Sequence, residues 1–204
     1  MMQRVNSIGI MGGTFDPVHY GHLIAAEFVR HEFKLNRVIF MPAARPPHKE
    51  INEVLDSEHR YKMVKLAIQG NPAFAISDLE MKRTGKSYTI DTVCYFLQQY
   101  PATDLFFIMG ADSLLMMDTW KDYRELSGLC RFVVVTRPGY VIERSDPALK
   151  NLPPILWERM EFLPIPGLDI SSTDIRQRVA ESRPIKYLLP LVVEQYILDK
   201  GLYR

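Results

Sequence analysis

The chain has 204 residues, enough to bury one substantial core, and we expect a single domain over residues 1–204. A formal net charge of +1, with Lys and Arg residues scattered along the chain, argues against a nucleic-acid partner or an anionic membrane surface. Two cysteines far apart, Cys94 and Cys130, exclude a disulfide framework and a cysteine zinc cluster. The N-terminal apolar run is too short for a secretory leader, and no stretch approaches the roughly 20 apolar residues of a membrane span. We therefore expect a soluble cytoplasmic protein with no membrane partner.

Apolar runs typical of buried strands alternate with segments of helical periodicity. The predicted strands cover residues 5–11, 37–42, 74–79, 105–109, 132–136 and 160–163. Helical spacing of i, i+3, i+4 and i+7 joins Ile90, Val93, Cys94 and Leu97, and a second helical face holds Met63, Leu66 and Ala67, with Gly70 as its stop. This alternation predicts an α/β fold with a doubly wound, mainly parallel sheet covered on both faces.

The last predicted strand is followed by helices, which form a small C-terminal helical part from about residue 171. One helix is predicted over 171–182, with serines at its start. Another is opened by Pro190 and closed by Gly201, with Val192, Val193, Tyr196 and Ile197 on one face. The proline-containing loop 42–56 and the segment 137–154 are the regions where we expect flexibility. Ligands of such sheets bind beyond the carboxyl ends of the strands, so the residues there are the candidates for a site.

The first predicted strand runs directly into Gly12-Gly13-Thr14-Phe15-Asp16-Pro17-Val18-His19-Tyr20-Gly21-His22. Two glycines permit a tight turn and a close approach of backbone N–H groups to a ligand. The helix that follows, with Ala25, Phe28, Val29 and Phe33 on one face, points its positive end at the same place. His19 and His22 lie three residues apart, the spacing that brings two side chains together at a helix start. Taken singly, a Gly-Gly turn or a histidine is usually structural; their combination favours a phosphate site.

Three other sites pair a functional interpretation with a structural one. Asp112, in Gly110-Ala111-Asp112-Ser113, could accept hydrogen bonds from a ribose or cap a helix. The run Ile170-Ser171-Ser172-Thr173-Asp174-Ile175-Arg176 could be an anion cradle or a serine-capped surface helix. Arg45-Pro46-Pro47-His48-Lys49 could bind phosphates or be a solvated loop. The chain has no G-x-G-x-x-G after the first strand and no zinc spacing, and Glu80 stands where a P-loop ending in Gly85-Lys86-Ser87 requires glycine.

These motifs carry a family resemblance over nearly the whole chain. His19-Tyr20-Gly21-His22 closely resembles the T/H-x-G-H signature of the nucleotidylyltransferase superfamily, and the run from Ser171 to Arg176 resembles its S/T-S-S/T-x-I-R signature. The stretches PPHK at 46–49, GKSYTIDT at 85–92 and Gly110-Ala111-Asp112, together with Trp120, are similar to those of bacterial nicotinate-nucleotide adenylyltransferases. Met116 departs from this pattern, since an aromatic residue often occurs there.

The resemblance implies an enzyme that transfers AMP from ATP to nicotinate mononucleotide, giving deamido-NAD and pyrophosphate in NAD biosynthesis. It implies that His19, His22 and Arg176 are catalytic. The implied ATP-binding residues are Gly12, Gly13, Thr14, Phe15, His19, His22, Gly110, Asp112, Arg137, Ile170, Ser171, Ser172, Thr173 and Arg176. Those implied for the mononucleotide are Lys49, Thr89 and Trp120. Mg²⁺ is expected to arrive with ATP, without protein metal ligands, and the enzyme is expected to be a monomer or a small homo-oligomer.

Rival interpretations differ in features that the chain either has or lacks. Phosphopantetheine adenylyltransferases are shorter and should lack the GKSYTIDT stretch and Trp120. A nucleotide-binding regulator without turnover would be favoured by loss of a histidine or of Arg176, and all three are present. Class I tRNA synthetases share the histidine motif but pair it with a KMSKS loop, which is absent.

Overall fold

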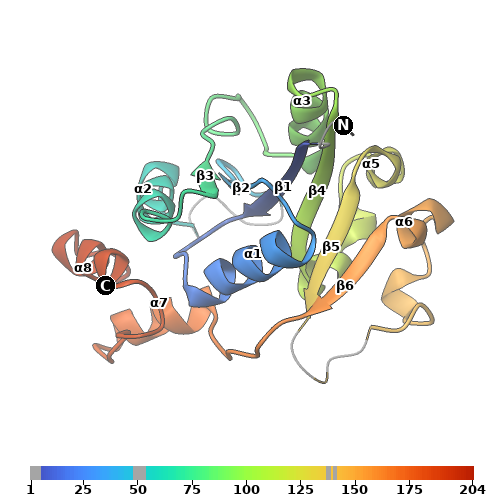
Figure 1. The fold of residues 1–204 in the computed structure, drawn as a ribbon. Coiled ribbons are helices and arrows are strands. Elements are labelled where there is room, and N and C mark those ends of the chain that lie inside the picture. Colours follow the sequence, from blue (N-terminus) through green and yellow to red (C-terminus); the bar gives the residue numbers. More distant parts are fainter. Residues whose placement is uncertain (1–5, 48–53, 137–138, 140–141) are drawn as a thin grey trace.

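The computed structural model describes residues 6–47, 54–136, 139 and 142–204 (Figure 1). Its sheet is built from β1 (Asn6–Gly13), β2 (Arg37–Pro42), β3 (Phe74–Ile76), β4 (Thr103–Gly110), β5 (Arg131–Thr136) and β6 (Met160–Pro164). The strands lie in the order β3-β2-β1-β4-β5-β6, and every neighbouring pair is parallel. The predicted doubly wound α/β fold is therefore confirmed.

Helices cover both faces of this sheet. One face packs against α1 (Tyr20–Glu32), α2 (Ser57–Ala67), α7 (Ser172–Ala180) and α8 (Leu191–Asp199). The other packs against α3 (Thr89–Gln99), α4 (Ala111–Leu115), α5 (Tyr123–Leu129) and α6 (Pro154–Glu158), with 3₁₀ turns at Met117–Thr119 and Pro147–Leu149. Strand β4 shows why both faces are apolar: Phe106 and Ile108 enter the first core, whereas Phe107 and Met109 enter the second. Successive side chains of a strand alternate, so a strand buried on both sides is apolar throughout.

The third strand is shorter than predicted. It ends at Ile76, where residues 74–79 were expected to be extended. Ser77 N still donates to Phe40 O, but the backbone then turns, because Met81 N and Lys82 N both donate to Asp78 O. Since β3 is the edge strand and pairs only with β2, the bond from Ser77 N is the last contact with β2 that is given for this segment among the described residues.

The apolar face predicted for the first helix is wrong at one position. Ala25, Ala26 and Val29 are buried against the sheet, but the Phe28 side chain is 43% exposed. At about 100° per residue, Phe28 lies just outside the arc that these three positions share. Figure 1 shows α1 lying across the near side of the sheet, so its outer surface faces away from the core.

The two C-terminal helices form where they were predicted, but the predicted apolar face of α8 is wrong at Val192, whose side chain is 49% exposed whereas Val193 and Ile197 are buried. Ser171 caps α7 by accepting a hydrogen bond from Asp174 N, and Pro190 caps α8. Gly201, just after α8, has a φ of +60°, a conformation that glycine adopts without strain. Among the described residues, no helix is both long enough and apolar enough to cross a bilayer.

The strand order reverses between β1 and β4, which are neighbours in the sheet although far apart in sequence. Their connections leave toward opposite faces, so the chain opens a crevice at their carboxyl ends. Gly12 and Gly13 end β1 and Gly110 ends β4. Three of the predicted site residues, Gly12, Gly13 and Gly110, therefore lie at this reversal.

Candidate active site

The two glycines at the end of β1 make room for aromatic rings. A Cβ on Gly12 would lie 3.0 Å from Phe107 Cζ, and a Cβ on Gly13 would lie 3.0 Å from Phe15 Cζ. Neither glycine is among those with a positive φ, so the tight-turn explanation offered by the sequence is wrong for them. Gly13 O accepts a hydrogen bond from Ala43 N at 2.9 Å, which ties this loop to the segment after β2.

His19 and His22 form a close pair of mutually tilted rings at the start of α1. His19 is the N-cap residue and His22 lies in the first turn, and their ring centroids are 3.8 Å apart. His19 N donates to His22 Nδ1 at 3.2 Å. In the neutral ring this leaves His22 Nε2 as the protonated nitrogen, a donor available to a ligand. The short spacing therefore fixes the tautomer of one histidine through the backbone of the other.

Burial keeps both histidines neutral near pH 7. Desolvation lowers the pKa of His19 to about 4, and its Nδ1 has no hydrogen-bond partner among the described residues. Desolvation, with a smaller contribution from neighbouring His19, also lowers the pKa of His22 well below its usual value. The pair thus offers neutral N–H donors.

The His19 shift predicts a loss of stability in acid. The unfolded chain binds a proton at His19 below about pH 6.5, whereas the folded protein does so only below about 4. The free energy of unfolding should therefore fall as the pH drops through this window, and His19 accounts for about 2 kcal/mol between pH 7 and pH 5. Urea unfolding at the two pH values measures the difference. In the variant His19→Gln the free energy of unfolding should depend less on pH. An unchanged pH dependence would contradict the assignment of this effect to His19.

A cavity of about 910 Å³, the histidine cavity, opens beside this pair. The predicted site residues that line it are Gly12, Gly13, Thr14, Phe15, His19, His22, Gly110, Asp112, Ile170 and Ser172. The structure therefore brings together the ends of β1 and β4 with the start of α7. Asp112 is exposed in the first turn of α4, and the cap position is occupied by Gly110, so Asp112 is not the N-cap.

The start of α7 is docked onto the β1–α1 loop, and its arginine does not line the cavity. Arg176 Nη1 donates to Asp16 O at 2.8 Å and lies 3.9 Å from Asp16 Oδ2. Ser172 Oγ donates to Pro17 O at 2.8 Å. Ser171 and Thr173 are exposed, the former as the helix cap. Arg137 lies outside the described residues.

A second cavity of about 430 Å³, the aromatic cavity, lies between α3 and the segment after α4. Thr89 and Trp120 both line it, and so does Met116, the position that departs from the family pattern. The remaining predicted mononucleotide residue, Lys49, lies outside the described residues. The aromatic cavity shares several wall residues with the histidine cavity, namely Gly12, Gly13, Thr14, Met109 and Ser113. Two cavities thus meet at the end of β1.

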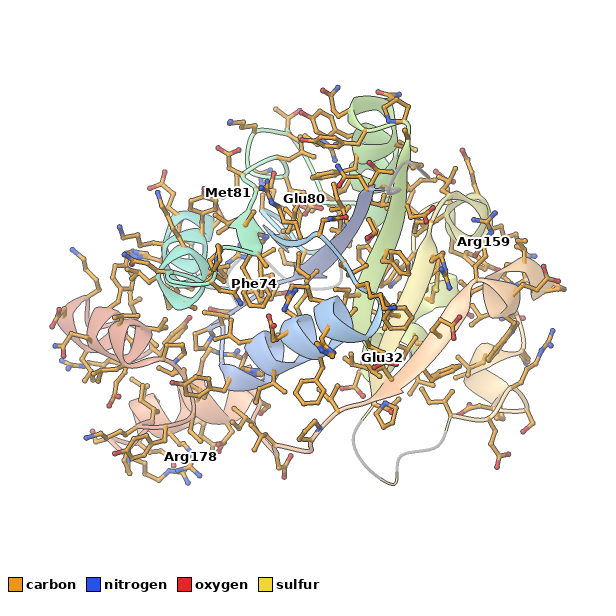
Figure 2. All side chains as sticks on the ribbon, in the orientation of Figure 1. Glu32, Phe74, Glu80, Met81, Arg159 and Arg178 are labelled. Carbon is orange, nitrogen blue, oxygen red and sulfur yellow. The ribbon has the colours of Figure 1, made fainter. Side chains whose placement is uncertain are left out.

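Glu80 is a buried residue in the wall of the aromatic cavity, and no sequence pattern pointed to it as a site residue. Thr92 Oγ1 donates to Glu80 Oε1 at 2.7 Å, and Arg83 Nη1 donates to Thr92 Oγ1 at 3.2 Å. Burial raises the pKa of the Glu80 carboxyl group. Glu80, labelled in Figure 2, lies in the segment between β3 and α3. In the sequence it was visible only as the residue that breaks a P-loop pattern.

Arg60 is the largest of the fully buried side chains. Its three guanidinium nitrogens donate to the carbonyl oxygens of Leu55, Thr14 and Ala44, at distances of 2.8, 2.7 and 3.1 Å. It therefore joins the β1–α1 loop to both ends of the long loop after β2. The sequence showed only one arginine within a helix, without a signal for burial.

Similarity to known proteins extends over the whole chain. The cytidylyltransferase-like family model matches residues 10–178. A relative from Moorella thermoacetica, named "probable nicotinate-nucleotide adenylyltransferase", is 50% identical over 100% of this chain and 94% of its own length. One of the same name from Thermoanaerobacter sp. is 51% identical, over 100% and 97%.

A solved structure shares the fold at lower identity. The nicotinic acid mononucleotide adenylyltransferase of Plasmodium falciparum, complexed with NaAD, superimposes with a TM-score of 0.80 over 97% of each chain, at 21% identity. At that identity the likeness supports the fold alone. The two relatives about 50% identical, in contrast, match the chain over its full length, including the segments Gly12–His22 and Ile170–Arg176. The chain therefore belongs to the cytidylyltransferase-like family and, within it, to the nicotinate-nucleotide adenylyltransferases.

Proposed function

We propose that this protein transfers AMP from ATP to nicotinate mononucleotide, giving deamido-NAD and pyrophosphate, a step of NAD biosynthesis. The observation that carries the proposal is the meeting of two cavities at Gly12–Thr14, beside the histidine pair. A transferase for two nucleotides needs two such spaces, with the reacting groups where they join. The names of relatives about 50% identical over the full length support the same reaction.

The larger, histidine cavity is the proposed place of ATP. His19 and His22 lie at its phosphate end, and Asp112 on α4 is placed to accept hydrogen bonds from the ribose hydroxyls. Ile170 and Ser172, at the start of α7, line the same cavity. Ser171 and Thr173 belong to the same helix start, whose free N–H groups suit an anion. We assign the triphosphate to this space between the two helix starts.

The smaller, aromatic cavity is the proposed place of the mononucleotide. Trp120 lines it as a stacking surface for the pyridine ring, and its own ring meets Phe107 edge-on at 5.8 Å. Thr89 is the first residue of α3 and lines the same wall. Pro46 and Pro47 line the cavity as well. Because Lys49 follows them closely in the sequence, we propose it as a partner of the mononucleotide phosphate.

In the proposed reaction an oxygen of the mononucleotide 5′-phosphate attacks the α-phosphorus of ATP. The new O–P bond forms as the bond from that phosphorus to the bridging oxygen breaks, and pyrophosphate leaves with the electron pair. The attacking phosphate is already ionised near pH 7, so no side chain must remove a proton. Positioning and stabilisation of charge on the α- and β-phosphates then supply the rate, and the neutral N–H of His22 is aimed at that task.

Arg176 is assigned to the departing pyrophosphate. Its Nη1 donates to Asp16 O and its Nη2 donates to Thr173 Oγ1. These bonds fix the guanidinium against the β1–α1 loop. Five N–H groups are present in a guanidinium, so donors are left for phosphate oxygens. The described residues contain no group of three or more His, Cys, Asp or Glu side chains placed for a metal ion. We propose that magnesium enters as the MgATP substrate.

Release of pyrophosphate from ATP tests the proposed function. The acceptors to be compared are nicotinate mononucleotide, nicotinamide mononucleotide and phosphopantetheine. We expect turnover with nicotinate mononucleotide, formation of deamido-NAD in equal amount, and none with phosphopantetheine. Turnover only with phosphopantetheine would favour the sister enzyme, and binding of ATP without turnover on any acceptor would favour a regulator.

Replacing Asp112 with asparagine should weaken the ATP complex selectively. The substitution keeps the size but removes the charge that strengthens hydrogen bonds to the ribose, a loss of about 1–2 kcal/mol. The KM for ATP should rise about 5- to 30-fold, while the KM for the mononucleotide stays nearly constant. Steady-state kinetics with each substrate varied in turn measures both values. The reverse pattern would show that the two substrates occupy the opposite cavities.

We propose the cytoplasm as the place of this reaction. Cys94 and Cys130 are both free thiols. Burial raises the pKa of Cys130 to about 12, which makes it a poor nucleophile at neutral pH. Two unpaired thiols suit a reducing compartment.

A further inference from the structure

We propose that Tyr203, the second-last residue, is a positioning residue for the catalytic loop: it holds Asp16 and thereby places His19 and His22. The Tyr203 hydroxyl donates to Asp16 Oδ1 at 2.6 Å, across 187 positions of sequence. Figure 1 shows the C-terminus beside α8 and α7, on the side of the molecule where the chain passes from β1 into α1. The inference rests on the proposed function of that loop.

Asp16 is a junction between separate segments of the chain. Its side chain is only 2% exposed. Oδ1 accepts from Tyr203, Oδ2 accepts from Leu55 N at 3.4 Å, and the backbone carbonyl accepts from Arg176 Nη1. A buried carboxylate is costly unless it is hydrogen-bonded, so each of these contacts fixes where Asp16 can lie. The shortest of them comes from Tyr203.

The charge of Asp16 is balanced by two arginines, of which Arg60 is buried and Arg176 is partly exposed. Asp16 acts electrostatically on Arg60, whose guanidinium holds the Thr14 carbonyl two residues before Asp16. Arg176 reaches Asp16 from α7 at 3.9 Å. Burial and the Asp16 carboxylate together raise the pKa of the Tyr203 hydroxyl, so it stays protonated and can donate over the whole working range of pH.

The backbone at Tyr203 adopts an uncommon conformation to make this contact. Its φ is +63°, in the left-handed region that bulky residues rarely occupy. Gly201, with φ +60°, turns the chain after α8, and the partly buried Tyr203 ring then packs against the core on the α1 face of the sheet. Conformations of this kind persist where the surrounding contacts outweigh their cost. Here the offsetting contacts are ring burial and the bond to Asp16.

The placement of the β1–α1 loop governs the geometry of the AMP transfer. Asp16 precedes His19 by three residues, and Val18 between them is completely buried, so a shift of the carboxylate moves the histidine pair. A displacement of about 1 Å at a reacting group can cost up to 10²-fold in rate. Loss of one anchoring hydroxyl, with the other contacts of Asp16 intact, should cost less, about tenfold in kcat.

Tyr203→Phe removes only this hydroxyl, and the chain supplies a matched control. The Tyr196 hydroxyl, on α8, lies 2.8 Å from His59 Nδ1 and touches no cavity described above as a substrate site. Tyr196→Phe therefore makes the same chemical change in the same part of the protein. Both variants should melt about 2–4 °C below the wild type. Only Tyr203→Phe should lower kcat, about tenfold, with the KM for the mononucleotide within about twofold.

Histidine NMR resonances give a readout that does not depend on activity. In Tyr203→Phe the ring resonances of His19 and His22 should move, whereas in Tyr196→Phe the affected resonance should be that of His59. Unchanged His19 and His22 resonances, or equal kcat losses in the two variants, would overturn the positioning role. A wild-type protein that releases no pyrophosphate with nicotinate mononucleotide would contradict the proposed function instead. The NMR comparison would then still decide whether Tyr203 places the histidines.

Discussion

We expect His22→Ala to lower kcat by about 10²–10³-fold, the scale for loss of one donor that stabilises charge in a transition state. His19 N donates to His22 Nδ1, so the neutral ring carries its proton on Nε2, and His22 lines the histidine cavity. That donor is fixed before substrate arrives and needs no reorganisation during the transfer. The KM for nicotinate mononucleotide should change little, because that substrate is assigned to the other cavity.

His31→Ala is the matched control for this substitution. His31 lies on the same helix, in its last turn, and is exposed. We expect the kcat of His31→Ala to equal that of the wild type. Circular dichroism should show that both variants are folded. A folded His22→Ala variant with wild-type kcat would remove His22 from the mechanism, and a collapsed variant would show that the ring serves packing with Phe15, whose ring centroid lies 5.0 Å away.

The fold was predictable because its central strands are buried on both faces. Strand β5, RFVVVT, is apolar from Phe132 to Val135, and such a run has few alternatives in a chain of alternating strands and helices. The errors lie where the local pattern is weak. Strand β3 sits at the edge and ends where its pairing ends, and Phe28 lies just outside the buried arc of α1.

The candidate site was predictable where its residues lie in one contiguous segment. The segment Gly12–His22 carries Gly12, Gly13 and both histidines within eleven residues, and all four residues line the histidine cavity. The contacts of Asp16 were not predictable, because the hydroxyl that holds it comes from Tyr203. A pairing across such a separation leaves no periodicity or spacing to read. Glu80 was missed for a similar reason, since its burial depends on how α3 packs.

We expect the enzyme to prefer the acid mononucleotide over the amide. The two acceptors differ only in a carboxylate against a carboxamide, so discrimination must come from hydrogen bonding and charge. The start of α3 lines the aromatic cavity, and its N-cap residue, Tyr88, makes no side-chain hydrogen bond to the helix. The first N–H groups of α3 and the Thr89 hydroxyl therefore present donors, and the positive end of the helix favours an anion.

A carboxylate accepts from all of these donors, whereas the amide would place its NH₂ against one of them and leave both unpaired. A mismatch of this kind can reject an analogue by orders of magnitude. We therefore expect kcat/KM to favour nicotinate mononucleotide by more than about 10². Pyrophosphate release with each mononucleotide at saturating ATP measures the ratio. Equal values would contradict the specificity while leaving the transfer of AMP intact.

Trp120 should contribute to affinity rather than to this choice. An aromatic stack is worth about 1–3 kcal/mol and is available to either ring. Trp120→Ala should therefore raise the KM of both mononucleotides about 5- to 150-fold, spare the KM for ATP and preserve most of the acid-over-amide ratio. The matched control is Trp157→Ala: Trp157 lies on α6, where it packs near Phe162 and lines neither cavity. A collapse of the ratio in Trp120→Ala alone would show that the indole, and not the start of α3, selects the acid.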